Sequence, residues 1–290
     1  MFTHLGELTK AAIFYVIAFG LAVVVAVAPI PNDPKPVLYM FPPTIAVLLM
    51  LLVLTRDGYT REGWADLGLR RAGFRRWPAA LVAPVLLIGS AYSIAWLSSA
   101  LTLADGIDRQ RVSGLIVDTL VSIAIGTATF VLGEELGWSG YLLPRLATLG
   151  PERAGALRGL LHAVWHFPLI FLTTTYLIHG NRFITVPLFV VTLTCAGLAY
   201  AYFRFSTGSV WPGTIAHAAF NNVAAAFDGL TDQSTPDVAA YLVGEGGVLM
   251  AAGAAVLAAW AAWRMRAYRR LPRPAAAASA SPGLRGSPVG

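Results

Sequence analysis

The sequence predicts an all-α polytopic membrane protein of about eight transmembrane helices, with both termini in the cytoplasm. Hydrophobic residues make up 57% of the 290 residues, whereas charged residues make up only 12%. Soluble domains average about 25% charged residues, so this composition excludes an ordinary soluble domain. Apolar runs close to the ~20 residues that cross a bilayer recur along the chain. The one cysteine, Cys195, excludes an internal disulfide.

Eight apolar segments are long enough to cross a membrane. They are Ala11–Ile30, Val37–Thr55, Pro78–Leu101, Ser113–Gly133, Gly155–Ile178, Phe183–Phe203, Gly208–Phe227 and Val238–Trp263. The fourth is expected to continue as a helix to about Leu143, where Pro144 would end or bend it. Residues 1–265 are predicted to form a single transmembrane domain. Residues 266–290 are rich in Pro, Ala, Ser and Gly, which predicts a disordered cytoplasmic tail.

Basic residues gather in alternate connections between these segments. Of the 21 Lys and Arg residues, all but Lys35, Arg109, Arg111 and Arg182 fall on the side of the two chain ends. The positive-inside rule then places both termini in the cytoplasm and predicts a multi-pass protein of the cell's inner membrane. The net charge of +6 is thereby explained by topology, and we expect no nucleic-acid partner.

Ionisable and amide side chains lie inside the apolar segments at three places. These are Glu134-Glu135, His162 with His166, and His217 with Asn221. On a helix, residues four apart share a face. The histidines of the fifth and seventh segments lie about 15 Å from the cytoplasmic side, at a helical rise of 1.5 Å per residue. Since a carboxylate near hydrocarbon is costly unless paired, hydrated or functional, we expect a wet cavity that opens to the cytoplasm.

Glutamate, histidine and asparagine together form a working set for peptide hydrolysis. Glutamate can act as a general base on water, a neutral histidine can orient that water, and histidine with asparagine can hold an oxyanion. Each residue alone also has a structural explanation. A buried histidine can be a satisfied core residue, an acidic pair can be an interfacial charge, and a buried asparagine can join two helices.

The three patches resemble the motifs of the CPBP family of intramembrane glutamic endopeptidases. That family includes Rce1-like CAAX proteases and bacteriocin-processing, Abi-type members. Its motifs EExxxR, FxxxH and HxxxN appear here as EELGWS, HAVWH and HAAFN, in the same order. The resemblance runs from about Asp66 to Asn222, the motif-bearing core, and it implies an eight-helix Rce1-like bundle.

The resemblance also implies a role for each catalytic residue. Glu134 would activate water with the help of His166, while His217 and Asn221 would stabilise the oxyanion of the tetrahedral intermediate. Glu135 would be a supporting or orienting acid. The substrate would be a peptide or a membrane-tethered protein, cleaved near the cytoplasmic membrane face without a cofactor.

Two positions depart from the family motifs. Ser139 stands where the first motif has arginine, so one carboxylate loses a charge-assisted partner. Arg145 lies beyond Pro144 and is not expected to replace that arginine. His162 stands where the second motif has phenylalanine, and we hypothesise that its imidazole pairs with the carboxylate that the arginine would have bound.

Three other functions remain open. A zinc-dependent membrane protease would use Glu134, His166 and His217 as ligands, although the chain has no HExxH motif. A catalytically degenerate family member could act as a membrane scaffold or immunity protein, and Ser139 favours this alternative. A transporter could use buried carboxylates and histidines as a proton relay, although no pair of broken helices repeats along the chain.

Overall fold

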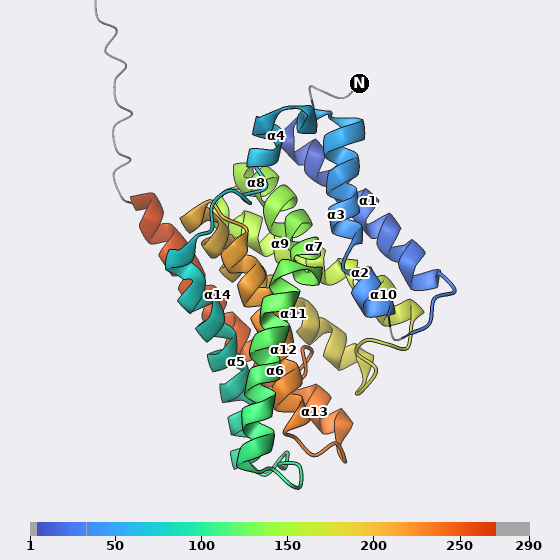
Figure 1. Cartoon of the computed structure of the whole chain (residues 1–290), viewed down its shortest axis with the longest axis vertical. Coiled ribbons are helices and arrows are strands. Elements are labelled where there is room, and N and C mark those ends of the chain that lie inside the picture. The colour runs from blue at the N-terminus through green and yellow to red at the C-terminus, as the bar shows by residue number, and fades with distance from the viewer. Residues whose placement is uncertain (1–4, 33, 271–290) are drawn as a thin grey trace, which may run out of the picture.

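The computed structural model describes residues 5–32 and 34–270, and this part of the chain is a helical bundle without a β-strand (Figure 1). The longer helices are α1 (Glu7–Val27), α3 (Pro42–Leu49), α5 (Trp77–Leu97), α6 (Arg109–Ala128), α9 (Pro151–Trp165), α11 (Arg182–Thr207), α12 (Trp211–Gly229) and α14 (Val248–Arg270). Shorter helices are α2 (Lys35–Tyr39), α4 (Arg61–Ala65), α7 (Phe130–Glu135), α8 (Leu143–Leu146), α10 (Phe167–Leu172) and α13 (Pro236–Leu242). The predicted all-α class is confirmed.

Seven segments of the described chain are long and apolar enough to cross a membrane. They are Glu7–Val27, Lys35–Leu54, Phe74–Leu97, Arg109–Leu149, Pro151–Leu172, Arg182–Thr207 and Val248–Arg266. The predicted seventh span corresponds to α12, which does not reach the same hydropathy because it carries His217, Asn221 and Asn222. This helix nevertheless packs against α5, α6 and α11 within the bundle. The polytopic membrane architecture is therefore confirmed, and the motif of His217 and Asn221 lies on a helix outside these seven candidate spans.

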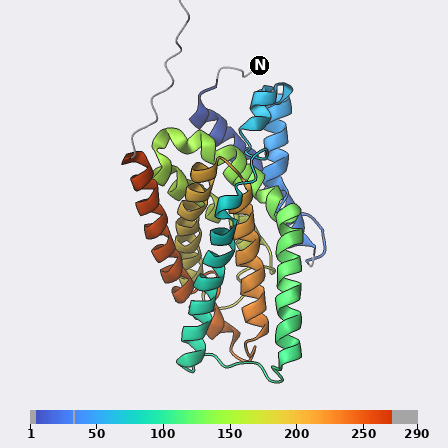
Figure 2. The same ribbon diagram turned by 60° about the vertical axis from the view of Figure 1, so that its left-hand side comes forward.

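The start of α1 and the end of α14 lie at the same end of the molecule (Figures 1 and 2). This arrangement agrees with the expectation that both chain ends share one side of the membrane, and which side that is stays a prediction. Helix α14 runs to Arg270, so residues 266–270, which were predicted to belong to the disordered tail, are helical. Residues 271–290 of the predicted tail lie outside the described residues.

The fourth predicted span is interrupted at a different place from the one expected. The break falls at Thr129, whose φ of −128° and ψ of −99° are not helical. Beyond it the chain continues through α7, a π-helical segment at Leu136–Leu142, and α8. Pro144 lies directly after the π-helical segment, in α8, and the chain stays helical through it, so Pro144 does not end the helix. The wider π-helical turns follow Glu134 and Glu135 directly.

Two other predicted spans are longer than the helices that the structure shows. The predicted fifth span, Gly155–Ile178, is α9 followed by α10, and it ends at Leu172. The predicted eighth span, Val238–Trp263, contains the short helix α13, a turn and then α14. In both cases apolar residues of a connection extend the hydrophobic run beyond the helix. These two connections, residues 173–181 and 244–247, both approach the cavity described below.

Helices α9 and α11 make the closest helix–helix contact around the site. Gly155 and Gly159 of α9 face Gly197 of α11, and a Cβ built on Gly159 would lie 2.3 Å from the carbonyl oxygen of Leu193. Small residues spaced four apart let two helix backbones approach in this way. The contact fixes α9 against α11 and thereby sets the position of the histidines that α9 carries.

Candidate active site

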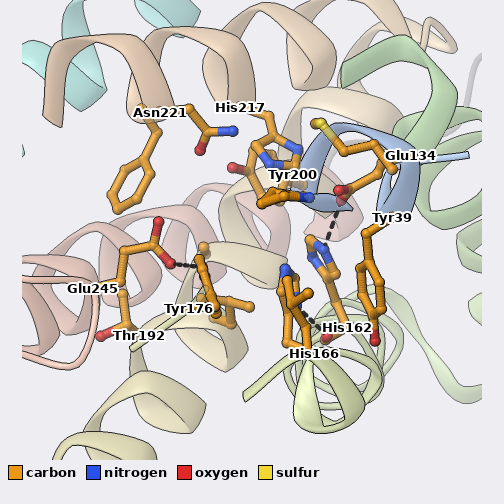
Figure 3. Close-up of a pocket in the computed structure, with 16 residues that line it drawn as sticks. Tyr39, Glu134, His162, His166, Tyr176, Thr192, Tyr200, His217, Asn221 and Glu245 are labelled. Carbon is orange, nitrogen blue, oxygen red and sulfur yellow. Dashed lines mark hydrogen bonds and ion pairs between the residues drawn. The ribbon is translucent and has the colours of Figure 1, made fainter. Parts of the chain in front are cut away.

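The three motif patches converge on one cavity in the middle of the bundle. The cavity has a volume of about 260 Å³, near the lower end of the roughly 300–1,000 Å³ typical of small-ligand sites. Its walls include four of the five predicted catalytic residues, namely Glu134, His166, His217 and Asn221 (Figure 3). Glu135 does not line it. The two adjacent carboxylates are therefore in different environments.

Glu135 is fully buried and surrounded by hydrogen-bond donors. Nη2 of Arg158 lies 2.5 Å from its Oε1, and Nδ1 of His217 lies 3.0 Å from the same oxygen. The hydroxyl of Ser139 donates to the other oxygen, Oε2. Since ionised carboxylates accept several hydrogen bonds and buried ones need a cation, this environment suits a permanently charged Glu135. Glu135 thereby ties together α7, α9 and α12.

Arg158 is the residue that sequence reasoning missed. Its position was assigned to a basic cytoplasmic stretch, but its side chain is 1% exposed and lies inside the bundle. Besides Glu135 it contacts the ring of Tyr200, with its Cζ 4.4 Å from the ring centroid. A guanidinium from α9 thus occupies the place beside the carboxylate that the motif arginine would have filled from position 139. Spacing within one motif cannot reveal a partner that comes from another helix.

Glu134 has a single side-chain partner in the described part of the chain. Nε2 of His162 lies 2.9 Å from its Oε2. Nδ1 of His162 is 3.4 Å from Nη1 of Arg158, which can only donate, so Nδ1 accepts and Nε2–H donates to Glu134. His162 therefore does pair with a carboxylate, but with Glu134 rather than with the one that Arg158 binds. Glu134 keeps its other oxygen for the cavity.

His166 is oriented by its own helix. Its Nδ1 is 3.0 Å from the backbone carbonyl oxygen of His162, which makes Nδ1 the donor and leaves Nε2 free. Aromatic rings pack around the imidazole, including Trp165 at 4.9 Å and Tyr176 at 5.4 Å between centroids. The hydroxyl of Tyr39 donates to the carbonyl oxygen of Trp165 at 2.6 Å and fixes this wall of the cavity.

His217 and Asn221 come from successive turns of α12. His217 donates from Nδ1 to Glu135, so its Nε2 is the nitrogen available to a bound molecule. The side-chain amide of Asn221 lines the cavity one turn further along and has no hydrogen-bond partner within the described residues (Figure 3). The two residues therefore share one helix face, as their spacing predicts, and that face lines the cavity.

The donor atoms that lie closest together for a metal are those of Glu134, His162 and His166. One donor atom from each falls within 4.8 Å of the others. The expected zinc set named His217 instead of His162; the donor atoms of His217 are not part of this close group, although its Nδ1 donates to Glu135 and leaves Nε2 free. A metal-binding histidine normally donates its second ring N–H to an acceptor. His166 and His217 meet this requirement, whereas His162 has the Arg158 guanidinium beside its second nitrogen.

The far wall of the cavity comes from connections between helices. Pro36 lies in the short helix α2, which links α1 to α3; Tyr176 lies between α10 and α11, and Glu245 precedes α14. These connections lie at the opposite end of α1 and α14 from Glu7 and Arg270. These segments line the cavity on the side away from the start of α1 and the end of α14, and the side to which the cavity opens stays a prediction.

Comparison with known proteins identifies the region that carries the site. A family model described as type II CAAX prenyl endopeptidase Rce1-like matches residues 116–223. The matched residues run from the middle of α6 into α12 and contain all three motif patches. They begin later than Asp66, where the resemblance inferred from the sequence begins, so residues 66–115 lie outside them. No curated protein matches the chain. The resemblance inferred from the motifs is confirmed over residues 116–223, and it supports an intramembrane protease of the CAAX type.

Proposed function

Because residues 116–223 are Rce1-like, we propose that this multi-pass membrane protein is an endopeptidase in which Glu134 activates the attacking water. The observation that carries the proposal is the different environment of the two carboxylates. Glu134 lines the cavity with one donor, whereas Glu135 is buried behind it with three. A general base needs a free oxygen within reach of water, and Glu134 has one.

In the proposed mechanism, Glu134 takes a proton from water, and His162 holds the carboxylate in place through Nε2–H. His166 presents a free Nε2 to the same cavity and can accept the second hydrogen of the water. The water oxygen then attacks the peptide carbonyl carbon, which becomes tetrahedral. Collapse of that intermediate breaks the C–N bond, and the proton on Glu134 passes to the leaving amine.

The oxyanion would be stabilised from α12. The amide of Asn221 can donate directly, since it has no partner within the described residues. Nε2 of His217 can donate only when this imidazole carries a second proton, because Nδ1 already donates to Glu135. The Glu135 carboxylate, 3.0 Å away, is the group that would stabilise such an imidazolium. Glu135 thus supports catalysis through His217 without touching the substrate.

A zinc protease is the second candidate. Glu134, His162 and His166 have the donor types of a catalytic His₂Glu site. However, binding a metal through Nε2 would require His162 to carry its proton on Nδ1, which faces Nη1 of Arg158 at 3.4 Å. Two donors would then oppose each other in a buried site. This conflict places the metal-independent mechanism first.

The substitution at Ser139 was the main reason to consider a degenerate scaffold or immunity protein. Arg158 supplies a guanidinium to Glu135 from α9, and Ser139 donates to the same carboxylate. The substitution therefore leaves the carboxylate paired, and it weakens the case for a degenerate site. We propose a peptide or a membrane-tethered protein as the substrate and the inner membrane as the location.

The test is cleavage of a quenched peptide library by the purified protein in lipid nanodiscs. Wild type, Glu134→Gln and wild type with a zinc chelator are assayed together, with Asp118→Asn as a control for loss of an exposed carboxylate on the same span. We expect activity that survives the chelator and Asp118→Asn but disappears in Glu134→Gln. Activity lost on chelation would favour zinc, and activity retained by Glu134→Gln would refute the proposed base.

A further inference from the structure

A second carboxylate lines the same cavity as Glu134. Glu245 lies in the turn between α13 and α14, and its half-buried side chain forms part of the cavity wall. Its Oε2 accepts a hydrogen bond from the hydroxyl of Tyr176. None of the ion pairs in the described part of the chain involves Glu245. The carboxylate therefore faces the cavity without a cationic partner.

An unpaired carboxylate in such a place is costly to maintain. Burial raises the pKa of Glu245, because the charged form loses water. Helix α14 begins three residues later and its N-terminus offers a partial positive charge, but the carboxylate makes its hydrogen bond with Tyr176 rather than with this helix end. The cost is recovered when a cation enters the cavity.

The two ends of the cavity are connected by a row of side chains (Figure 3). Glu245 and Tyr176 lie at one end, Glu134 and His162 at the other, and His166 lies between them. The ring of Tyr176 stacks on His166 with an interplanar angle of 22° and a centroid distance of 5.4 Å. A group that reaches Glu245 therefore lies along the same cavity as the peptide bond that Glu134 would hydrolyse.

The walls of the cavity also suit a cation with an aliphatic stem. Tyr176 and Phe220 line the cavity and present aromatic side chains, which attract cations through their ring faces. Leu169 and Leu193 add apolar surface for methylene groups. Lysine and arginine have this combination of an apolar stem and a charged head.

We propose that Glu245 forms a subsite for a cationic side chain of the substrate, a lysine or arginine close to the cleaved bond. The inference rests on the proposed protease function and specifies its substrate class. The competing explanation is a latch, in which the Tyr176–Glu245 hydrogen bond only holds the 173–181 connection against the turn before α14. The charge and the hydrogen bond can be removed separately, so the two explanations are separable.

The experiment measures peptide binding rather than cleavage. Glu134→Gln protein in nanodiscs serves as the background, because its cavity is intact while hydrolysis is blocked. The probes are apolar octapeptides in which one lysine is moved through every position, each paired with a twin that has uncharged norleucine there. Glu245→Gln removes the charge but keeps an acceptor for Tyr176, and Tyr176→Phe does the reverse. Asp232→Asn, a partly exposed acid outside this cavity, controls for general negative charge.

We expect at least one lysine peptide to bind about tenfold more tightly than its twin, as close charge pairs at binding sites commonly provide. That preference should disappear with Glu245→Gln and persist with Tyr176→Phe and Asp232→Asn. Equal binding of all twins, or a preference that survives Glu245→Gln, would overturn the inference. So would absence of binding by every peptide.

Cleavage by the wild type separates the failure of this inference from the failure of the protease proposal. If the wild type cleaves peptides without any lysine preference, the subsite is wrong and the protease stands. If lysine peptides bind through Glu245 but none is cleaved, the subsite stands and the protease proposal is wrong.

Discussion

Replacing Arg158 with serine removes the only guanidinium that contacts Glu135 in the described part of the chain. The two side chains are 1% and 0% exposed, so the carboxylate left behind is buried and uncompensated. Breaking a buried ion pair in this way costs about 3–5 kcal/mol. We expect Arg158→Ser to unfold at a markedly lower temperature and to lose cleavage activity, because His217 and α9 both depend on Glu135 for their position.

An arginine at position 139 can restore the positive charge beside Glu135. Ser139 already donates to Glu135, so an arginine there starts from the correct side of the carboxylate. Ser139→Arg alone places two guanidinium groups beside one carboxylate and should destabilise the protein. The double variant, Ser139→Arg with Arg158→Ser, restores a single cation and should recover stability and activity relative to either single variant.

The assay is a double-mutant cycle on the thermal midpoint and on the cleavage rate in nanodiscs. We expect a coupling free energy of at least about 1 kcal/mol in favour of the double variant, within the range found for residues in contact. Arg153→Ser is the matched control, since Arg153 is an exposed arginine on the same helix. An additive cycle, or an Arg158→Ser protein as stable and active as the control, would refute the role assigned to Arg158.

Two further predictions concern the packing of α9 and the charge of Glu245. Gly159→Ala should lower both the thermal midpoint and activity, because its new Cβ would lie 2.3 Å from a carbonyl oxygen of α11 and overpacking costs about 1–3 kcal/mol. Gly20→Ala, which meets nothing within 4 Å, should leave both unchanged, and equal effects of the two would contradict the close contact. Burial raises the pKa of Glu245, and Tyr176 and His217 are the titratable groups that act on it. The charged form of Glu245 therefore becomes more populated as pH rises. In binding titrations, the preference for lysine peptides should increase with pH. The same increase in the Glu245→Gln protein would exclude Glu245 as its source.

The sequence predicts the fold well wherever one helix accounts for one apolar run. Hydropathy alone is enough for α1, α5 and α11, because each is an uninterrupted helix long enough to cross the bilayer. It fails at Thr129, where the helix breaks without proline or glycine, and at the 173–181 connection, whose apolar residues extend the run beyond the helix. Those breaks depend on contacts with other helices, which no local pattern records.

The same distinction applies to the candidate site, where local patterns predict which residues a helix carries but not their partners on other helices. The motifs predict which helices carry Glu134, His166 and His217, and spacing predicts that residues four apart share a face. The partner of Glu135 could not be predicted, because Arg158 is nearby only after α9 has packed against α7 and α12. Counting arginines by side of the membrane assigned it to the cytoplasm, since hydropathy cannot distinguish a buried ion pair from a charge in water.

The central claim is that Glu134 activates water while Glu135 holds the site together. The most direct test compares single-turnover cleavage by Glu134→Gln and Glu135→Gln in nanodiscs, with the thermal midpoint of each protein recorded on the same sample. We predict that Glu134→Gln keeps the wild-type midpoint and loses about 10²–10⁴-fold in rate, the usual contribution of a general base. Glu135→Gln should lower the midpoint, because Arg158 would lose its buried counter-ion. A Glu134→Gln protein that cleaves at the wild-type rate, or a Glu135→Gln protein with an unchanged midpoint, would contradict this division between the two carboxylates.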